Sequence, residues 1–147
     1  MLSLLADTRR ADSDARRRDA VSTAPLVLVV EDHEDTRTLL KMALEMRGYR
    51  VSLAVDGEEG LRLARRERPR LVIMDATLPR LDGLAATRRM RSDSELAAVP
   101  VVFLSGHAQP SFRAAALDAG GTEFLVKPVA LEYLATVVER YLRPDAA

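Results

Sequence analysis

Short apolar runs rich in β-branched residues alternate with amphipathic stretches along most of the chain, and this alternation constrains the fold most strongly. Three runs contain no polar residue, which is typical of strands buried on both faces of a parallel sheet. They are Leu26–Val30, Leu71–Met74 and Val101–Leu104. Tyr49–Val55 alternates apolar and polar residues, which predicts a more exposed edge strand, and Thr122–Val126 is a fifth candidate.

Five helix-like stretches separate and follow these runs. In the last of them Leu131, Leu134, Val138 and Tyr141 recur at three- and four-residue spacing, which places them on one helix face. The expected helices are Thr36–Arg47, Glu58–Arg68, Leu84–Arg91, Ser111–Ala119 and Ala130–Leu142. Strands that alternate with helices in this way predict an α/β fold, a doubly wound five-stranded parallel sheet.

Composition narrows the function classes. The chain has 147 residues, enough for one compact domain, and its 22 basic and 22 acidic residues balance, which argues against direct nucleic-acid binding. Without cysteine there is no thiol catalysis and no zinc–thiolate site. No apolar run approaches the roughly 20 residues that span a bilayer. We therefore expect a cytoplasmic protein without membrane insertion.

Residues 1–24 differ from the rest because arginines and aspartates interleave there and large apolar residues are few after Leu5. Such mixed charge suits either a disordered extension or a helix that docks on a partner. We place the folded domain at residues 25–147, with Pro25 at its entry.

Polar residues stand where four of the predicted strands end. Glu31 and Asp32 follow the first strand, Asp75 closes the third, and Ser105 and Lys127 end the fourth and fifth. Because ligands bind at the carboxyl edge of such sheets, we expect these side chains to converge. Neighbouring carboxylates repel one another, and a hard divalent cation relieves that repulsion. The edge therefore predicts a Mg²⁺ site open to a phosphoryl ligand, with Mn²⁺ as an alternative ion.

Each of these residues also has a plainer interpretation. Glu31 and Asp32 would serve as solvated loop residues or as a helix cap, Ser105 as a turn residue, and Lys127 as a surface lysine. Asp75 is harder to dismiss, because a charge at the end of an apolar strand is costly without partners. Their joint occurrence at four strand ends favours a site.

The motifs resemble the receiver family of two-component signalling over about residues 26–143. The family's acidic pair is similar to Glu31-Asp32, and its phospho-acceptor segment is similar to DATLPRLDG, which begins at Asp75. Ser105 and the pair Lys127-Pro128 match the positions after the fourth and fifth strands. The resemblance implies a flavodoxin-like (βα)5 fold with strand order 2-1-3-4-5.

The resemblance also implies a role for each acidic residue. Asp75 would accept a phosphoryl group from a phosphohistidine. Asp32 and Asp75 would bind Mg²⁺ together with the backbone carbonyl of Thr77, and Glu31 would hold a metal-bound water. Magnesium would offset the charge of the transferring phosphoryl group.

Three further positions carry roles by the same resemblance. Lys127 would contact a phosphoryl oxygen, aimed by a cis peptide bond between Lys127 and Pro128. Ser105 would donate a hydroxyl hydrogen bond to another phosphoryl oxygen. Phe124 would be a switch ring that rotates when Ser105 moves, although a fixed core ring is the simpler alternative. His33 and His107 are lone histidines that we expect at the surface.

The implied function is a phosphorylation-activated switch of a two-component system or phosphorelay. It is no conventional enzyme, since it would catalyse only its own phosphoryl uptake and dephosphorylation. The implied partners are a sensor histidine kinase or histidine phosphotransfer protein and a downstream protein target. Few residues follow Leu142, so we expect a stand-alone receiver. Its output face, also a candidate homodimer face, would comprise the fourth helix, fifth strand and fifth helix.

Three other functions are less consistent with the sequence. A flavodoxin-like cofactor binder needs a phosphate loop after the first strand, where EDHED would instead repel phosphate. An aspartyl phosphatase would have a second acid two residues after its nucleophile, and Thr77 stands there instead. A receiver that serves only as a scaffold would not need the complete set of acidic residues, serine and lysine.

Overall fold

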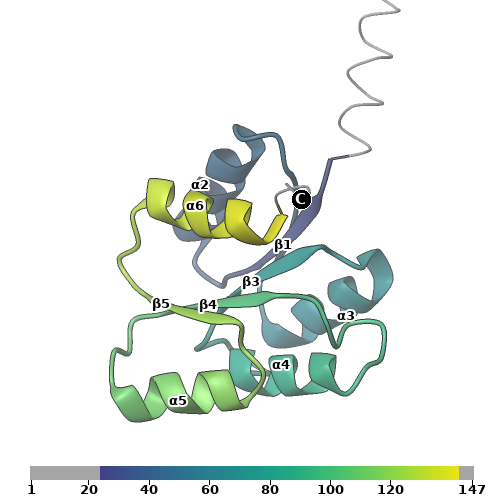
Figure 1. The fold of residues 1–147 in the computed structure, drawn as a ribbon, viewed down its shortest axis with the longest axis vertical. Helices are drawn as coiled ribbons and strands as arrows, with labels where there is room; N and C mark the ends of the chain where they lie inside the picture. The colour runs from purple at the N-terminus through teal and green to yellow at the C-terminus, as the bar shows by residue number, and fades with distance from the viewer. Residues whose placement is uncertain (1–23, 143–147) are drawn as a thin grey trace, which may run out of the picture.

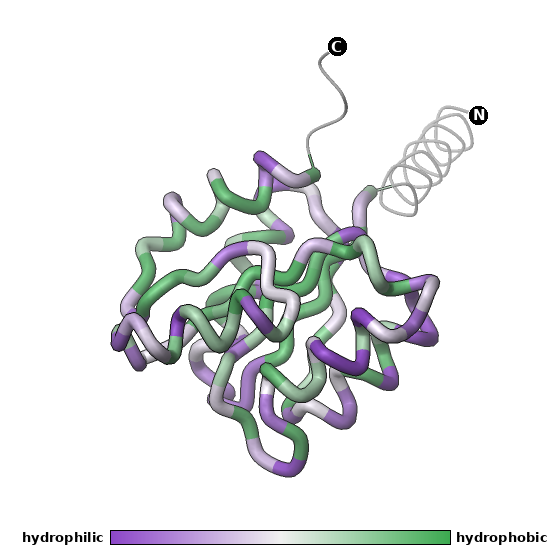
Figure 2. Tube along the Cα trace, turned by 60° about the horizontal axis from the view of Figure 1, so that its bottom comes forward, coloured by the Kyte–Doolittle hydropathy of each residue, from purple (hydrophilic) through white to green (hydrophobic). Residues whose placement is uncertain are grey.

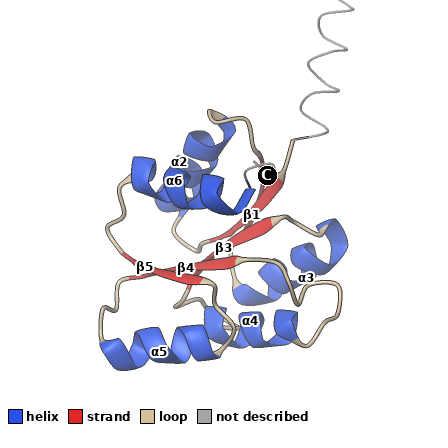
Figure 3. Ribbon diagram, viewed as in Figure 1, coloured by secondary structure: helices blue, strands red, loops and turns tan. Residues whose placement is uncertain are grey.

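The computed structural model describes residues 24–142, and the prediction for the charged extension falls almost entirely outside them. The described chain forms a five-stranded parallel sheet in the order β2-β1-β3-β4-β5 (Figures 1 and 3). The strands are β1 (Leu26–Val30), β2 (Arg50–Ala54), β3 (Leu71–Asp75), β4 (Val101–Ser105) and β5 (Glu123–Val126). The helices are α2 (Glu34–Glu45), α3 (Gly57–Glu67), α4 (Gly83–Arg91), α5 (Pro110–Asp118) and α6 (Leu131–Leu142). The predicted doubly wound α/β fold and strand order are confirmed.

Two apolar layers hold the helices on opposite faces of the sheet, because successive strand side chains point to alternate faces. On one face Val30, Met74 and Phe103 pack with α3, α4 and α5. On the other face Val29 and Ile73 pack with α2 and α6. The central strands are accordingly hydrophobic along their length, whereas the helices mix both classes of residue (Figure 2). Each fully buried aliphatic or Phe side chain stabilises the fold by about 1.5–3 kcal/mol.

The edge position predicted for the second strand is confirmed, since β2 pairs only with β1. Most residues of β2 are half-buried, and Val51 and Leu53 pack against one apolar layer. The first helix was predicted two residues too late: α2 begins at Glu34 and ends at Glu45. The acidic Glu34 and Asp35 suit its N-terminal turn, where the helix dipole favours negative charge.

Caps and turn residues define the other helix ends. The Asp56 side chain accepts a 2.8 Å hydrogen bond from the Glu59 N–H at the start of α3, and Asp82 does the same for Ala85 in α4. At the end of α3, Arg68 adopts a left-handed conformation with φ of 51° just before Pro69. In residues 24–142, every helix is too short or too polar to cross a membrane.

Candidate functional site

The carboxyl edge of the sheet gathers the polar residues that the sequence singles out. Asp75 and Ser105 are the last residues of β3 and β4, and the register places Asp75 beside Leu104. Glu31 directly follows β1, and Lys127 directly follows β5. The side chains of three of them, from three different strands, meet in one ion-pair cluster: Glu31, Asp75 and Lys127.

Lys127 links the two buried carboxylates. Its Nζ donates hydrogen bonds to Glu31 Oε1 at 2.9 Å and to Asp75 Oδ2 at 3.0 Å. Burial lowers the pKa of Lys127, but the hydrogen bonds to Glu31 and Asp75 outweigh it and leave the pKa above its usual value. The amine is therefore charged at neutral pH. The peptide bond between Lys127 and Pro128 is cis.

Glu31 is the least compensated charge of the cluster. The residue is 1% exposed, and within residues 24–142 its Oε2 has no hydrogen-bond partner. Burial, followed by the neighbouring Asp75, raises the pKa of Glu31 from 4.5 to about 7, although Lys127 opposes the shift. An ionised Glu31 would thus need more positive charge than Lys127 supplies.

Asp75 is held in place by its neighbours on the chain. Its Oδ1 accepts a 2.9 Å hydrogen bond from the Thr77 N–H, and the residue is 6% exposed. Gly83 passes so close to the strand end that an added Cβ would lie 2.3 Å from the Asp75 carbonyl oxygen. A larger residue than Gly83 would therefore displace the segment that carries Asp75 and Thr77.

Four potential ligands lie together at this edge: Glu31, Asp32, His33 and Asp75 each offer an atom within 4.8 Å of the others. Carboxylate oxygens are the donors that Mg²⁺ prefers. Among the described residues Glu31 Oε2 accepts no hydrogen bond, and its nearest printed contact is His33 Nδ1 at 3.9 Å, so this oxygen is available as a metal ligand. The donor set thus fits a hard divalent cation. A cation here would also supply the positive charge that Glu31 needs.

His33 belongs to this cluster, which sequence reasoning missed. The side chain is 74% exposed, in keeping with the expected surface placement, but its Nδ1 lies 3.3 Å from Asp32 Oδ1. The sequence feature that could have revealed it is the position of His33 directly after Asp32. Arg37 was also overlooked: from α2 its Nη1 donates to the backbone carbonyls of Glu31 at 3.0 Å and Asp32 at 3.3 Å. Arg37 therefore fastens the acidic loop to the helix that follows it.

A second contact fastens the loop after β3. Arg80 has a positive φ of 67° and pairs with the buried Asp56 at 3.2 Å. Beside this pair, a Cβ on Gly57 would lie 1.7 Å from the Leu81 carbonyl oxygen. The loop from Asp75 to Asp82 is thus packed tightly against the start of α3, which limits its freedom to move.

Ser105 is as deeply buried as Glu31 and has a separate partner. It is 1% exposed, and its Oγ accepts a 3.0 Å hydrogen bond from the His107 N–H, as a turn residue would. Phe124 is buried one strand away and stacks edge-on against Phe112, with ring centroids 6.0 Å apart. The His107 ring lies 5.3 Å from Phe112 and extends this aromatic row. An added Cβ on Gly106 would meet no atom within 4 Å.

Comparison with known protein families agrees with this geometry. Residues 27–139 match the family model described as the response regulator receiver domain. The chain belongs to the response regulator receiver family. Residues 27–139 thus form a receiver domain, the signalling switch of two-component systems.

Two mycobacterial regulators illustrate the relationship. Response regulator MprA of Mycobacterium leprae is 40% identical over 124 residues, which cover 82% of this chain and 54% of MprA. Transcriptional regulatory protein PrrA of Mycobacterium tuberculosis is 39% identical over 126 residues, which cover 85% of this chain and 53% of PrrA. The chain therefore spans about half the length of these curated relatives.

Solved structures show the same receiver fold. The chemotaxis protein CheY4 of Vibrio cholerae superposes with a TM-score of 0.77 at 29% identity, covering 82% of this chain and all of CheY4 (100%). The receiver domain of the sensor histidine kinase PA1611 of Pseudomonas aeruginosa gives 0.77 at 34% identity, covering 83% of this chain and 100% of that domain. That structure has a magnesium ion coordinated in its active site cleft.

Proposed function

We propose that Asp75 accepts a phosphoryl group from a phosphohistidine and that the resulting aspartyl phosphate switches the receiver to its signalling state. The observation that carries this proposal is the Lys127 amine, which lies 3.0 Å from Asp75 and 2.9 Å from Glu31. A carboxylate nucleophile beside a fixed cation is suited to an incoming anionic phosphoryl group.

In the transfer step a carboxylate oxygen of Asp75 forms a bond to phosphorus while the phosphorus–nitrogen bond to the donor imidazole breaks. The bonding electron pair leaves with that nitrogen, which takes up a proton. Lys127 holds one phosphoryl oxygen by its charge, and the Ser105 hydroxyl donates a hydrogen bond to another. Water attack on the same phosphorus atom would return Asp75 to its free carboxylate.

Mg²⁺, or Mn²⁺ in its place, would neutralise charge on the phosphoryl oxygens when bound. Asp32 and Asp75 would hold the ion with the backbone carbonyl of Thr77, and Glu31 would orient its hydration shell. The support is the donor chemistry of this cluster and the unpartnered Oε2 of Glu31. The His33 ring is close enough to Asp32 to modulate access to the ion.

The phosphoryl donor needs a surface beside Lys127. A groove of about 450 Å³ between α2 and α6 includes Lys127 in its wall, and Leu39 and Leu131 contribute exposed apolar surface to it. Such a groove suits an apolar helix face, as in helix-in-groove recognition. We therefore assign it to the sensor histidine kinase or histidine phosphotransfer protein, with the exchange taking place in the cytoplasm.

The output proposal concerns Phe124. Movement of Ser105 towards the phosphoryl group would release the turn at His107 and free the aromatic row in which Phe124 lies. The face made by α5, β5 and α6 would then change its affinity for a downstream protein or for a second copy of the chain. Phe124→Ala should leave phosphoryl uptake intact while partner affinity no longer responds to phosphorylation. A variant whose partner affinity still rises on phosphorylation would refute this assignment.

The test of the phosphorylation proposal is a mass measurement. The protein is incubated with acetyl phosphate in Mg²⁺ or in EDTA, and its intact mass is recorded. We expect a gain of one phosphoryl group only with Mg²⁺, no gain for Asp75→Asn, and an unchanged gain for the matched variant Asp118→Asn on exposed α5. Uptake by folded Asp75→Asn, or none by folded wild type, would contradict the proposal.

A further inference from the structure

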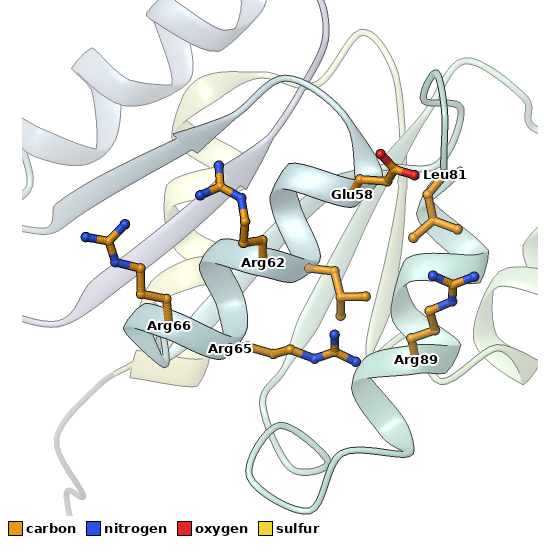
Figure 4. Close-up of a pocket in the computed structure, with 7 residues that line it drawn as sticks. Glu58, Arg62, Arg65, Arg66, Leu81 and Arg89 are labelled. Atoms are coloured by element: carbon orange, nitrogen blue, oxygen red, sulfur yellow. The ribbon is translucent and has the colours of Figure 1, made fainter.

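A second groove lies away from the phosphorylation site, between α3 and α4. It has a volume of about 440 Å³, and arginines provide most of its polar wall. Arg62, Arg65 and Arg66 come from α3 at three- and four-residue spacing, which puts them on neighbouring faces of the helix. Arg89 comes from α4, and Arg65 extends from α3 towards that helix (Figure 4).

Four arginines but a single carboxylate, Glu58, line this groove among the described residues. Arg65 pairs with Asp93 at 3.6 Å, but within residues 24–142 no carboxylate forms an ion pair with Arg62, Arg66 or Arg89. Arg65 and Arg66 lie in the last turn of α3, and Arg89 lies in the last turn of α4, where the helix dipole favours positive charge. That effect explains where single arginines stand, but four like charges around one hollow still repel one another, and a bound anion would relieve this.

The groove is distinct from the phosphorylation site. The residues that line it include none of the acidic cluster, Ser105 or Lys127. Because α3 begins just after the carboxyl end of β2, its C-terminal turn, with Arg65 and Arg66, points away from the edge that carries Asp75. It also lies on the opposite face of the sheet from the groove between α2 and α6. A ligand here would leave both free.

The chemistry of the lining indicates the ligand. Leu61 and Leu81 give the groove an apolar part, and Glu58 lies with Leu81 at one end (Figure 4). No aromatic side chain lines the groove for nucleic-acid bases to stack on. Guanidinium groups bind carboxylates in a planar, bidentate geometry, and an apolar floor accepts an aliphatic side chain.

We propose that the groove between α3 and α4 binds an acidic segment of a partner protein, in which glutamates or aspartates flank at least one aliphatic residue. The carboxylates pair with Arg62, Arg66 and Arg89 while the aliphatic side chain covers Leu61 and Leu81. Because the groove includes none of the acidic cluster, Ser105 or Lys127, this surface would tether the receiver to its partner without phosphorylation at Asp75.

The experiment uses a fluorescein-labelled synthetic peptide of repeating Glu-Glu-Leu and measures its binding to the full chain by fluorescence anisotropy. We expect Arg62→Gln with Arg89→Gln to weaken binding by about tenfold or more, because two charge-assisted contacts are lost. The matched double variant, Arg47→Gln with Arg113→Gln, removes the same charge from the exposed turn after α2 and from exposed α5, and should bind within about twofold of wild type.

Three results of the anisotropy measurements would overturn the proposal. The first is that a Gln-Gln-Leu peptide binds as tightly as the Glu-Glu-Leu peptide. The second is that both double variants weaken peptide binding equally. The third is that a single-stranded DNA oligonucleotide binds more tightly than the peptide and depends on the same arginines. A second measurement does not depend on the folding of variants: amide chemical shifts of wild-type protein titrated with the peptide. Shifts confined to α3, α4 and Leu81 support the site, and shifts centred elsewhere refute it.

Discussion

Replacing Glu31 by Gln should remove a pH-dependent loss of stability from the metal-free protein. Burial and Asp75 raise the pKa of Glu31 from 4.5 to about 7. Between these values the carboxyl ionises in the unfolded chain but stays protonated in the folded one, so the free energy of unfolding falls as pH rises. The contribution of this protonated carboxyl to stability is fully present below pH 4.5 and lost above about pH 7.

The magnitude follows from the shift. A pKa raised from 4.5 to about 7, at about 1.4 kcal/mol for each pH unit, corresponds to a loss on the order of 3–4 kcal/mol. Glu31 is 1% exposed, so solvent screening removes little of this. The Glu31→Gln variant keeps an oxygen acceptor for Lys127 but has no proton to lose. Its stability relative to wild type should therefore rise by that amount between pH 4.5 and 7.

Urea unfolding in EDTA, at intervals from pH 4.5 to 8, measures the difference directly, and Glu58→Gln on exposed α3 is the matched control. We expect the control to follow wild type. Saturating Mg²⁺ should restore the stability of wild type at high pH more than it raises that of Glu31→Gln. If the free energy of unfolding depends on pH in the same way for wild type and Glu31→Gln in EDTA, the buried carboxylate of Glu31 does not cause the loss of stability at high pH.

Four further variants test the surroundings of the site. Lys127→Met leaves two buried carboxylates without their cation and should cost roughly 2–3 kcal/mol in urea unfolding at pH 8, where an unchanged midpoint would contradict the bridging role. Gly57→Ala forces a Cβ to within 1.7 Å of the Leu81 carbonyl oxygen and should lower the thermal midpoint by the equivalent of about 3 kcal/mol or more. Gly106→Ala is the matched control: its Cβ meets open space, so the free energy of unfolding should change by less than about 0.5 kcal/mol. Asp82→Ala removes the cap of α4 and should cost about 1 kcal/mol, and no loss would mean that the hydrogen bond to Ala85 is replaced by solvent.

The meeting of distant residues at one edge could be predicted because periodicity and parallel topology leave few alternatives, whereas the strand order was predicted from the resemblance to the receiver family. Continuous apolar runs are typical of parallel strands in a sheet covered on both faces. In a parallel sheet all carboxyl ends lie at one edge, so Glu31 after the first strand and Asp75 at the end of the third were expected there together. The start of α2 was placed too late because Glu34 and Asp35 are polar. Apolar periodicity cannot detect a first turn made of polar residues. The negative charge of Glu34 and Asp35 does suit the helix dipole.

Contacts that depend on side-chain reach could not be predicted from the chain order. Arg37 and Arg80 look like ordinary surface arginines in the sequence, yet each fastens a loop of the site through one specific contact. The orphaned Oε2 of Glu31 likewise depends on how deeply that carboxylate is buried, which composition does not reveal. The groove of arginines lies between α3 and α4, and how closely these two successive helices pack depends on the fold and not on the chain order.

The charge balance of the site explains why one lysine is not sufficient there. Lys127 bridges Glu31 and Asp75, yet the pKa of Glu31 remains about 7, so a single positive charge does not stabilise two buried carboxylates at neutral pH. A phosphoryl group on Asp75 would add further negative charge to the same small volume. The carboxylates of Asp32 and Glu31 fit a divalent ion with hard oxygen ligands, which would supply this additional positive charge.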